Sequence, residues 1–288
     1  MQCRKPSIVP YRYYAMKNSY LEQYKQQQLR RCQLKQLGML QEIDRICRKH
    51  NIGYWLDGGT LLGAVRHGGF IPWDDDIDIA MREEDLQRFV EVAPQELPDT
   101  LFLQSRETEP GYPSPVAKVR DKNSFYVEPS DDMAADYQKG LFIDIFPMIN
   151  YPTVSRHFAK KVLLGISKSY SILHHSHYYS LRATAELFWF GGKYLFYKGI
   201  WDIVSALRPK TTYLSNILIN NGYGIMHRQD SVFPLSTIIF EGKTFMAPAN
   251  PDAYLSDLYR NYMELPPEEK RIVHSIFIQP ELLTEEKD

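Results

Sequence analysis

The sequence predicts an α+β fold in which a mixed sheet core is flanked by helices and carries a helical insertion. Short apolar or alternating runs between residues 51 and 150 are typical of strands. A segment rich in Gln, Lys, Arg and Leu precedes them, and long helical stretches follow Pro152. We therefore divide the chain into an N-terminal helical region (1–50), a core (51–150), a helical, basic, aromatic-rich subdomain (151–235) and a C-terminal region that completes the core (236–288).

The first predicted element is a long helix before the core. Its apolar residues recur at steps of three to five residues: Leu29, Cys32, Leu37, Leu40, Ile43 and Cys47. This spacing predicts an amphipathic helix from about 18 to 49 that packs on the core. The apolar run 52–56 then predicts a short strand. Gly58-Gly59 predicts a turn, after which Thr60 caps a helix through Val65.

The remaining elements follow from alternation, turn residues and helix-start residues. In the core, a helix is predicted at 83–92, and strands are predicted at 76–81, 116–120, 124–128 and 141–146, the last ended by Pro147. After Pro152, helices are predicted at 153–176, 183–207, 211–220 and 251–260, with a hairpin at 237–245 and a helix start at 266–269.

The amino-acid composition and the charge distribution limit the kinds of protein that this chain can be. In a chain of 288 residues, 44% hydrophobic and 13% aromatic residues suffice for a substantial core. The net charge of -1 hides an asymmetry: residues 1–50 carry eleven Lys or Arg against three acids, and residues 151–210 carry nine against two. These basic segments either face anionic lipid or a polyanionic acceptor, or they are ordinary solvated faces. We expect no nucleic-acid partner.

Location is predicted from cysteine usage and apolar runs. The three cysteines are odd in number and lie in the first fifth of the chain, which indicates no disulfide framework and favours a reducing compartment. The N-terminus lacks the apolar core of a secretory signal. The stretch 187–207 is interrupted by two lysines and an aspartate, so we expect no spanning helix. We expect a cytoplasmic protein. For segment 170–201 there are two alternatives: it packs in the core of a helical subdomain, or it contacts the inner face of the membrane.

Three acids are candidates for metal binding. Asp76 and Asp78 lie two apart in a predicted strand, so their side chains share a face, with Cα atoms roughly 6 to 7 Å apart. Their carboxylates repel each other unless a cation lies between them. Mg²⁺ suits such carboxylates together with substrate phosphates, and Mn²⁺ is the alternative. Asp144 lies in an otherwise apolar strand, where it is a metal ligand, a base, or the partner of a buried Lys or Arg.

Small and cationic residues near these acids predict a phosphate site. Three residues stand between a predicted strand and a predicted helix: Gly58, Gly59 and Thr60. Backbone N–H groups and a helix N-terminus can approach an anion there. Four cations lie near predicted strand and loop ends: Arg66, His67, Lys118 and Arg120. Such groups can neutralise phosphate charge.

Four segments resemble the LicD family: DGGTLLGAVRH (57–67), GFIPWDDDID (69–78), GLFIDIFP (140–147) and LPP (265–267). Members of this family are phosphocholine and related phospho-alcohol transferases of bacterial surface polysaccharides, and they are similar to the fukutin-related ribitol-phosphate transferases. The resemblance implies a nucleotidyltransferase-type fold. In that fold a glycine turn precedes an acid-x-acid strand, and a third acid lies on a neighbouring strand. Asp76, Asp78 and Asp144 match those three places.

The chain departs from the family pattern in two places. Near the C-terminus the family has Tyr-Gly, a variable residue, then Asp-Tyr-Met, whereas residues 259–263 read YRNYM. The zinc-binding cysteines of the fukutin-related branch have no counterpart, because Cys32, Cys47 and His50 lie along one predicted helix. We therefore expect no structural zinc. Segment 151–235 matches no motif, and we expect it to set the choice of acceptor.

The resemblance implies Mg²⁺-dependent transfer of a phospho-alcohol, such as phosphocholine, from a CDP-linked donor to a hydroxyl of a surface glycan or its lipid-linked precursor. Asp76 and Asp78 would hold the metal, and Asp144 would complete the site or accept the proton of the hydroxyl. One alternative is nucleotidyl transfer, in which NMP ends on the acceptor. Another is a non-catalytic, membrane-peripheral scaffold of glycan assembly, against which the presence of all three acids argues.

Overall fold

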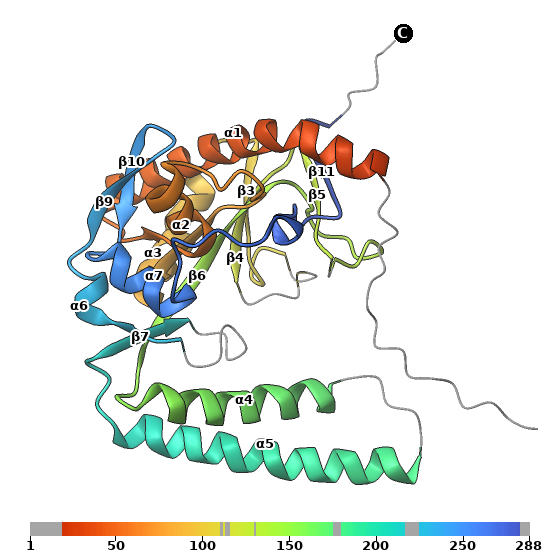
Figure 1. Ribbon diagram of the computed structural model, residues 1–288, viewed down its shortest axis with the longest axis vertical. Helices are drawn as coiled ribbons and strands as arrows, with labels where there is room; N and C mark the ends of the chain where they lie inside the picture. The colour runs from red at the N-terminus through yellow and green to blue at the C-terminus, as the bar shows by residue number, and fades with distance from the viewer. Residues whose placement is uncertain are drawn as a thin grey trace, which may run out of the picture.

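A computed structural model describes residues 19–109, 112, 116–129, 131–174, 180–216 and 225–282. Within these residues, seven strands form one mixed sheet with the order β1-β2-β6-β4-β3, and β7 and β8 continue it from β6. Helices contact this sheet, and a hairpin of two long helices, α4 and α5, extends along one side of the molecule (Figure 1). The fold is α+β and nucleotidyltransferase-like, which confirms the fold class predicted from the sequence.

The elements have the following bounds among the described residues. The helices are α1 (Ser19–His50), α2 (Gly58–His67), α3 (Glu83–Glu96), α4 (Arg156–Leu173), α5 (Leu181–Leu207), α6 (Gln229–Val232), α7 (Pro251–Tyr259) and the 3-10 helix η1 (Glu268–Lys270). The strands are β1 (Trp55–Leu56), β2 (Asp78–Arg82), β3 (Leu101–Gln104), β4 (Ala117–Asp121), β5 (Phe125–Val127), β6 (Phe142–Tyr151), β7 (Tyr213–Asn216), β8 (His227–Arg228), β9 (Ser236–Phe240), β10 (Lys243–Ala247) and β11 (Phe277–Gln279).

Helix α1 lies across the core, as its apolar spacing predicts. Its buried stripe joins the main hydrophobic cluster from Leu37 to Cys47, and Leu29 and Cys32 join a second, smaller cluster. Two buried glutamines of α1 face the loop before β2. Gln33 Nε2 donates to the carbonyl oxygen of Asp74 (2.9 Å), and Gln36 Nε2 donates to that of Asp75 (3.0 Å). A buried amide without a partner is costly, so these bonds fix the loop relative to the helix.

The centre of the sheet brings three charged residues into register. Strands β2 and β6 pair in parallel, with Asp78 opposite Asp144. Strand β4 pairs antiparallel with the other side of β6, with Lys118 also opposite Asp144. Directly paired residues in a sheet point their side chains to the same face. Residues far apart in the sequence therefore share one face of the sheet.

Strand β6 continues to Tyr151, beyond the end predicted at Pro147. Strand β4 pairs with residues 142–145 of β6, whereas β7 pairs with residues 148–151. Pro147 thus falls in the gap between two antiparallel neighbours, where its missing N–H interrupts neither ladder. The prediction that Pro147 ends the strand is wrong for this reason.

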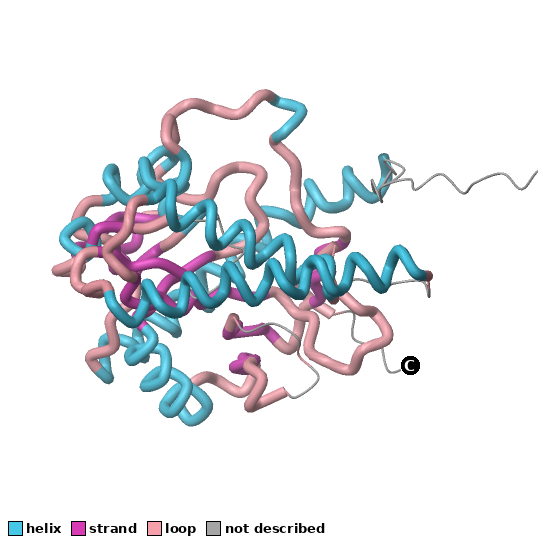
Figure 2. Tube along the Cα trace, turned by 90° about the horizontal axis from the view of Figure 1, so that it is seen from below, coloured by secondary structure: helices cyan, strands magenta, loops and turns pink. Residues whose placement is uncertain are grey.

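Helices α4 and α5 pack along each other and lie side by side in both views (Figures 1 and 2). The predicted helix at 211–220 is wrong for residues 213–216, which form β7 by pairing with the end of β6. Residues 217–220 lie outside the described part of the chain. Among the described helices, none combines the length and apolar character required to cross a membrane.

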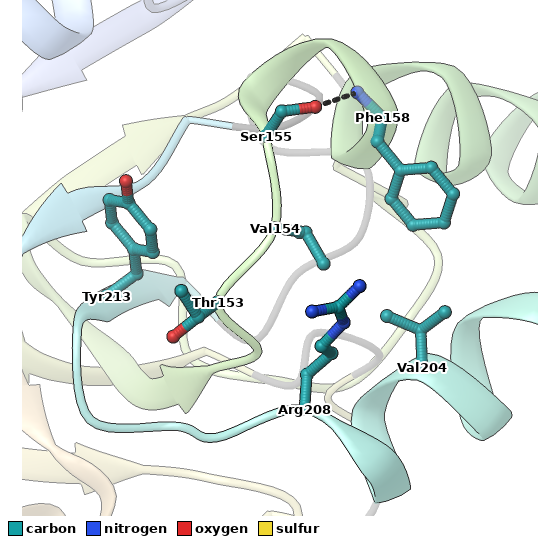
Figure 3. Close-up of a pocket in the computed structure, with 7 residues that line it drawn as sticks. All are labelled: Thr153, Val154, Ser155, Phe158, Val204, Arg208 and Tyr213. Carbon is teal, nitrogen blue, oxygen red and sulfur yellow. Dashed lines mark hydrogen bonds between the residues drawn. The ribbon is translucent and has the colours of Figure 1, made fainter.

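A cavity of about 600 Å³ lies where the start of α4 and the end of α5 approach β7 (Figure 3). Its lining residues are Thr153, Val154, Ser155, Phe158, Val204, Arg208 and Tyr213. Ser155 is the N-cap of α4, because its side chain accepts a hydrogen bond from the N–H of Phe158 (3.2 Å). None of the residues predicted to carry the chemistry lines this cavity, so it belongs to the helical hairpin.

Candidate active site

The site is built around the N-terminus of α2. Asp57 is the N-cap, since its side chain accepts a hydrogen bond from the N–H of Gly58 (2.7 Å). Thr60 was the predicted cap, and that prediction is wrong. Its Oγ1 instead accepts a hydrogen bond from the N–H of Asp78 (2.8 Å), and its side chain is buried. Thr60 therefore holds the first residue of β2 against the first turn of α2.

The two glycines make room for two carboxylates. A Cβ at Gly58 would lie 2.6 Å from Asp78 Oδ2, and a Cβ at Gly59 would lie 2.6 Å from Asp74 Oδ2. Gly58 also has a φ of +51°, in the left-handed region where a side chain is strained. The positive end of the helix dipole favours negative charge at this place. Both carboxylates thus approach the helix N-terminus as closely as the backbone permits.

The three predicted acids come together in one cluster of half-buried carboxylates. Strand β2 begins at Asp78 rather than at residue 76, so Asp76 lies in the loop before the strand. Burial and then repulsion from Asp78 raise the pKa of Asp76 well above its usual value. Burial and then repulsion from Asp144 do the same to the pKa of Asp78. A cluster of this kind resists full ionisation unless a cation offsets its charge.

Lys118 is the cation nearest to Asp144. Its buried Nζ lies 3.2 Å from Asp144 Oδ1 and 3.0 Å from Glu128 Oε2, and 3.4 Å from the centre of the Phe142 ring. Burial lowers the pKa of Lys118, but Asp144 and Glu128 outweigh it, and the net pKa is raised. Burial raises the pKa of Asp144 although Lys118 opposes this. The alternative that Asp144 pairs with a buried Lys therefore has direct geometric support.

A cleft of about 510 Å³ opens beside Gly59 and Asp74. Its other lining residues come from α2, from the loop after α2 and from the C-terminal segment: Leu62, Arg66, Ile71, Trp73, Tyr259, Asn261, Tyr262, Glu264, Leu265, Pro266, Pro267 and His274. Both the LPP segment and part of the departing YRNYM segment thus border the cleft.

The two cations at the end of α2 are placed differently. Arg66 lines the cleft, and its Nη1 donates to the carbonyl oxygen of Tyr262 (2.9 Å). Burial and then Arg271 lower the pKa of Arg66. His67 is exposed and sits edge-on to Trp73, with ring centres 6.3 Å apart, and it is not among the residues that line the cleft. The structure therefore brings Arg66 to the cleft and leaves His67 at its outer edge.

Asp75 ties the acidic loop to the C-terminal segment. It is fully buried and accepts hydrogen bonds from the N–H groups of Ser275 (2.8 Å) and His274 (3.3 Å). Asp74, Asp75 and His274 have ligand atoms within 4.8 Å of one another and form a second candidate cation group among the described residues. Burial and then Asp75 raise the pKa of Asp74 to about 6. Because backbone N–H groups already occupy Asp75, we assign it a structural role.

The sequence analysis missed the role of Asp57 and the aromatic residues behind it. The Asp57 carboxylate is buried and accepts a hydrogen bond from Tyr254 OH (2.9 Å), which in turn accepts one from Trp55 Nε1 (3.1 Å). The His227 ring stacks on that of Tyr254 at 3.7 Å. Burial raises the pKa of Asp57, and His227 opposes this. Its position directly before Gly58 was the signal, because Asp is a favoured N-cap.

This sheet, with its acids gathered at a helix N-terminus, is as expected for a nucleotidyltransferase-type enzyme. A family model described as "LicD/FKTN/FKRP, nucleotidyltransferase domain" matches residues 51–182. "Lipopolysaccharide cholinephosphotransferase LicD" of Haemophilus influenzae is 30% identical over 275 residues, which covers 86% of this chain and 96% of that protein. The chain belongs to the LicD family, and it is a phosphotransferase.

A shorter likeness extends to animal proteins. "Ribitol 5-phosphate transferase FKRP" of Homo sapiens and of Mus musculus are each 57% identical to this chain over 35 residues. These residues make up 12% of this chain and 7% of those proteins. The match to the Haemophilus protein, by contrast, extends well beyond the segment that the family model covers.

Proposed function

We propose that the protein transfers a phospho-alcohol, phosphocholine in the first instance, from a CDP-linked donor to a hydroxyl of a cell-surface glycan or its lipid-linked precursor. The observation that carries the proposal is the register of Asp78 opposite Asp144, with Asp76 beside them, at the N-terminus of α2. The name of the Haemophilus relative, a lipopolysaccharide cholinephosphotransferase, supports both the alcohol and the type of acceptor. A cytoplasmic position at the inner face of the membrane belongs to the proposal, because a lipid-linked precursor lies at a membrane.

The residues present fit a hard divalent cation, Mg²⁺ or Mn²⁺. The donor set consists of carboxylate oxygens alone, which Mg²⁺ prefers. Asp144 Oδ1 is buried, and Lys118 Nζ lies 3.2 Å from it as an ion pair, so this carboxylate already stands beside a positive charge. The cation would supply charge neutralisation for the donor phosphates.

The chain's own residues would position the reactants. Asp76 and Asp78 would hold the cation, and Asp144 would complete its site or accept the proton of the attacking hydroxyl. The N–H groups of Gly59 and Thr60 at the start of α2 and the guanidinium of Arg66 would bind donor phosphate. The N–H of Gly58, also predicted to bind phosphate, already donates to the side chain of Asp57. Lys118 acts through Asp144, which it holds in place. Such catalysis relies on positioning and electrostatics and needs no side-chain nucleophile.

The fate of a labelled donor tests this proposal. With CDP-choline labelled separately on choline and on cytidine, we expect the choline label in the glycan and the cytidine label in CMP. EDTA should stop the reaction, and added Mg²⁺ should restore it. Cytidine label in the glycan would show nucleotidyl transfer instead, which the same acids could support. Metal-independent donor binding without turnover on any glycan would favour the scaffold alternative. A reaction without acceptor is the control for donor hydrolysis.

Replacement of Gly58 tests the close approach of Asp78 to the helix N-terminus. Gly58→Ala places a Cβ against Asp78 Oδ2 and strains a residue at φ +51°. We expect a loss of about 1 to 2 kcal/mol of stability and a fall in turnover of about 100-fold, since a displaced reactive group costs that much. Urea unfolding and initial rates measure the two effects. Gly191→Ala is the matched control, because its Cβ would meet nothing within 4 Å. Unchanged turnover of Gly58→Ala would contradict the placement of Asp78.

A further inference from the structure

Helix α5 is apolar on two opposite faces. Its inner face packs on α4 through partly buried aromatic and aliphatic side chains: Tyr194, Tyr197, Ile200 and Trp201. No residue of its 27 is fully buried. A helix that only covers a core has one apolar stripe and a polar outer face. Packing on α4 accounts for the inner face of α5, and it does not account for the second apolar face.

The outer face is a continuous stripe of exposed apolar residues. At 3.6 residues per turn, an arc of about 120° along α5 contains only Leu, Phe, Trp, Ile, Ala and Gly. Six large side chains in this arc are 61% to 79% exposed: Phe188, Trp189, Leu195, Phe196, Ile203 and Leu207. The five charged residues of α5 all lie outside the arc. Monomeric soluble proteins rarely leave such a contiguous patch in water, so the stripe indicates a binding surface.

No described part of the chain covers this outer face. Helix α5 is the outermost element on its side of the molecule, with α4 between it and the sheet (Figure 1). A Cβ added at Gly192 or Gly199, which both lie in the arc, would meet nothing within 4 Å. The stripe is also long, because 27 helical residues extend about 40 Å. It thus presents a straight, open ridge rather than a pocket.

The segment that carries the stripe is predominantly basic, although two cations of α5 are paired with its acids, Arg182 with Glu186 and Lys198 with Asp202. Residues 151–210 contain nine Lys or Arg and two acids. Lys193 Nζ lies 5.0 Å from the centre of the Trp189 ring, at the border of the stripe. Lys160, Lys161 and Lys168 are exposed on α4. Aromatic and aliphatic side chains between basic ones match a lipid interface, where apolar groups enter the acyl region and cations meet anionic headgroups.

We propose that the outer face of α5 binds the surface of an anionic lipid bilayer. The helix lies parallel to the membrane, with Phe188, Trp189 and Phe196 among the residues that enter it. The charges of α5 lie outside the apolar arc, with Lys193 at its border, which is the arrangement of an interfacial helix and not of a spanning one. This surface is separate from the carboxylate cluster, and binding to lipid requires neither donor, metal nor acceptor.

Flotation with vesicles tests the proposal. We expect the full chain to float with vesicles of phosphatidylglycerol and phosphatidylcholine, and to float less with phosphatidylcholine alone or at high salt. The triple variant Phe188→Ser, Trp189→Ser, Phe196→Ser should float at least about tenfold less. Its three side chains are exposed, so its thermal unfolding should match that of the wild type. Leu34→Ser with Ile239→Ser is the matched control, since these residues are 50% and 54% exposed outside α5, and it should float like the wild type.

Quenching of tryptophan fluorescence by brominated lipid gives a second measurement on the unaltered helix. Trp189 should be quenched in anionic vesicles, and Trp189→Phe should remove most of the quenching, because the other three tryptophans lie outside the stripe. The proposal is overturned if the wild-type chain does not float with anionic vesicles or if the triple variant floats equally well. It is also overturned if light scattering without lipid shows a dimer that the triple variant loses, because the stripe would then join two copies. The proposed transfer reaction is unaffected by either outcome.

Discussion

Asp78→Asn should reduce transfer from CDP-choline by at least about 1,000-fold, because loss of a metal ligand removes several kcal/mol of charge stabilisation. The amide keeps the shape of the carboxylate, and the backbone bond from the N–H of residue 78 to Thr60 Oγ1 remains. The fold should therefore persist. Initial rates with labelled donor, at saturating Mg²⁺, measure the effect. Asp99→Asn is the control, since Asp99 is exposed and lies outside the cluster.

In the absence of metal, the Asp78→Asn variant should be more stable than the wild type. Burial and Asp144 raise the pKa of Asp78, so the folded state binds this proton more tightly than the unfolded chain does. An unfolded Asp has a pKa of about 4, and Asp78 in the folded protein has a higher one. Between these two pKa values the free energy of unfolding of the wild type falls as the pH rises. The uncharged amide of the variant does not titrate and carries no such dependence. The stability advantage of Asp78→Asn should widen with pH in EDTA, and Mg²⁺ should raise the melting temperature of the wild type more than that of the variant.

Near wild-type turnover of Asp78→Asn would refute the metal site.

Lys118→Met should destabilise the protein by about 3 to 5 kcal/mol, the usual cost of removing one partner of a buried ion pair. It leaves Asp144 and Glu128 without the ammonium that lies 3.2 Å and 3.0 Å from them. We also expect loss of transfer, because Asp144 loses the group that holds it. Urea unfolding and initial rates measure the two effects.

Two further variants separate charge from packing at this position. Lys118→Arg keeps the positive charge and should recover much of the stability, although the larger guanidinium need not restore turnover. Lys160→Met removes an exposed lysine of α4 and should change stability by no more than about 0.5 kcal/mol. Wild-type turnover in Lys118→Met would show that Asp144 needs no cationic neighbour.

Elements with a local pattern could be predicted from the sequence. The apolar spacing of α1 and the short helix at Gly58-Gly59 depend on neighbours in the chain, and both helices were predicted close to their observed place. The predicted turn at Gly58-Gly59 is wrong, because both glycines belong to the first turn of α2. Strand β7 was predicted as helix because its partner, the end of β6, lies more than sixty residues earlier. Tertiary pairing overrides local preference in such a segment. Strand β3 was missed because four residues at the edge of a sheet carry too short a pattern.

The site was predictable in its acids and not in its contacts. The spacing of Asp76 and Asp78 is local, and Asp144 stood out as an acid in an apolar strand. The contact between Lys118 and Asp144 depends on the register of β4 against β6, which the sequence does not contain. Catalytic roles for these residues stay predictions.

The bond from the N–H of Ser275 to Asp75 has a consequence for synthesis of the protein. Glutamines of α1 bind the backbone of the acidic loop, residues 74–76, on one side. On the other side the loop binds Ser275, which is 200 residues later in the chain. Lys25 Nζ also donates to the carbonyl oxygen of Ser275 (2.9 Å), so α1 completes its contacts only when the same segment is present. A ribosome releases residues in order, and domains complete their contacts only when the last partner emerges. We therefore expect a nascent chain to gain its fixed acidic loop only after residue 275 has left the exit tunnel.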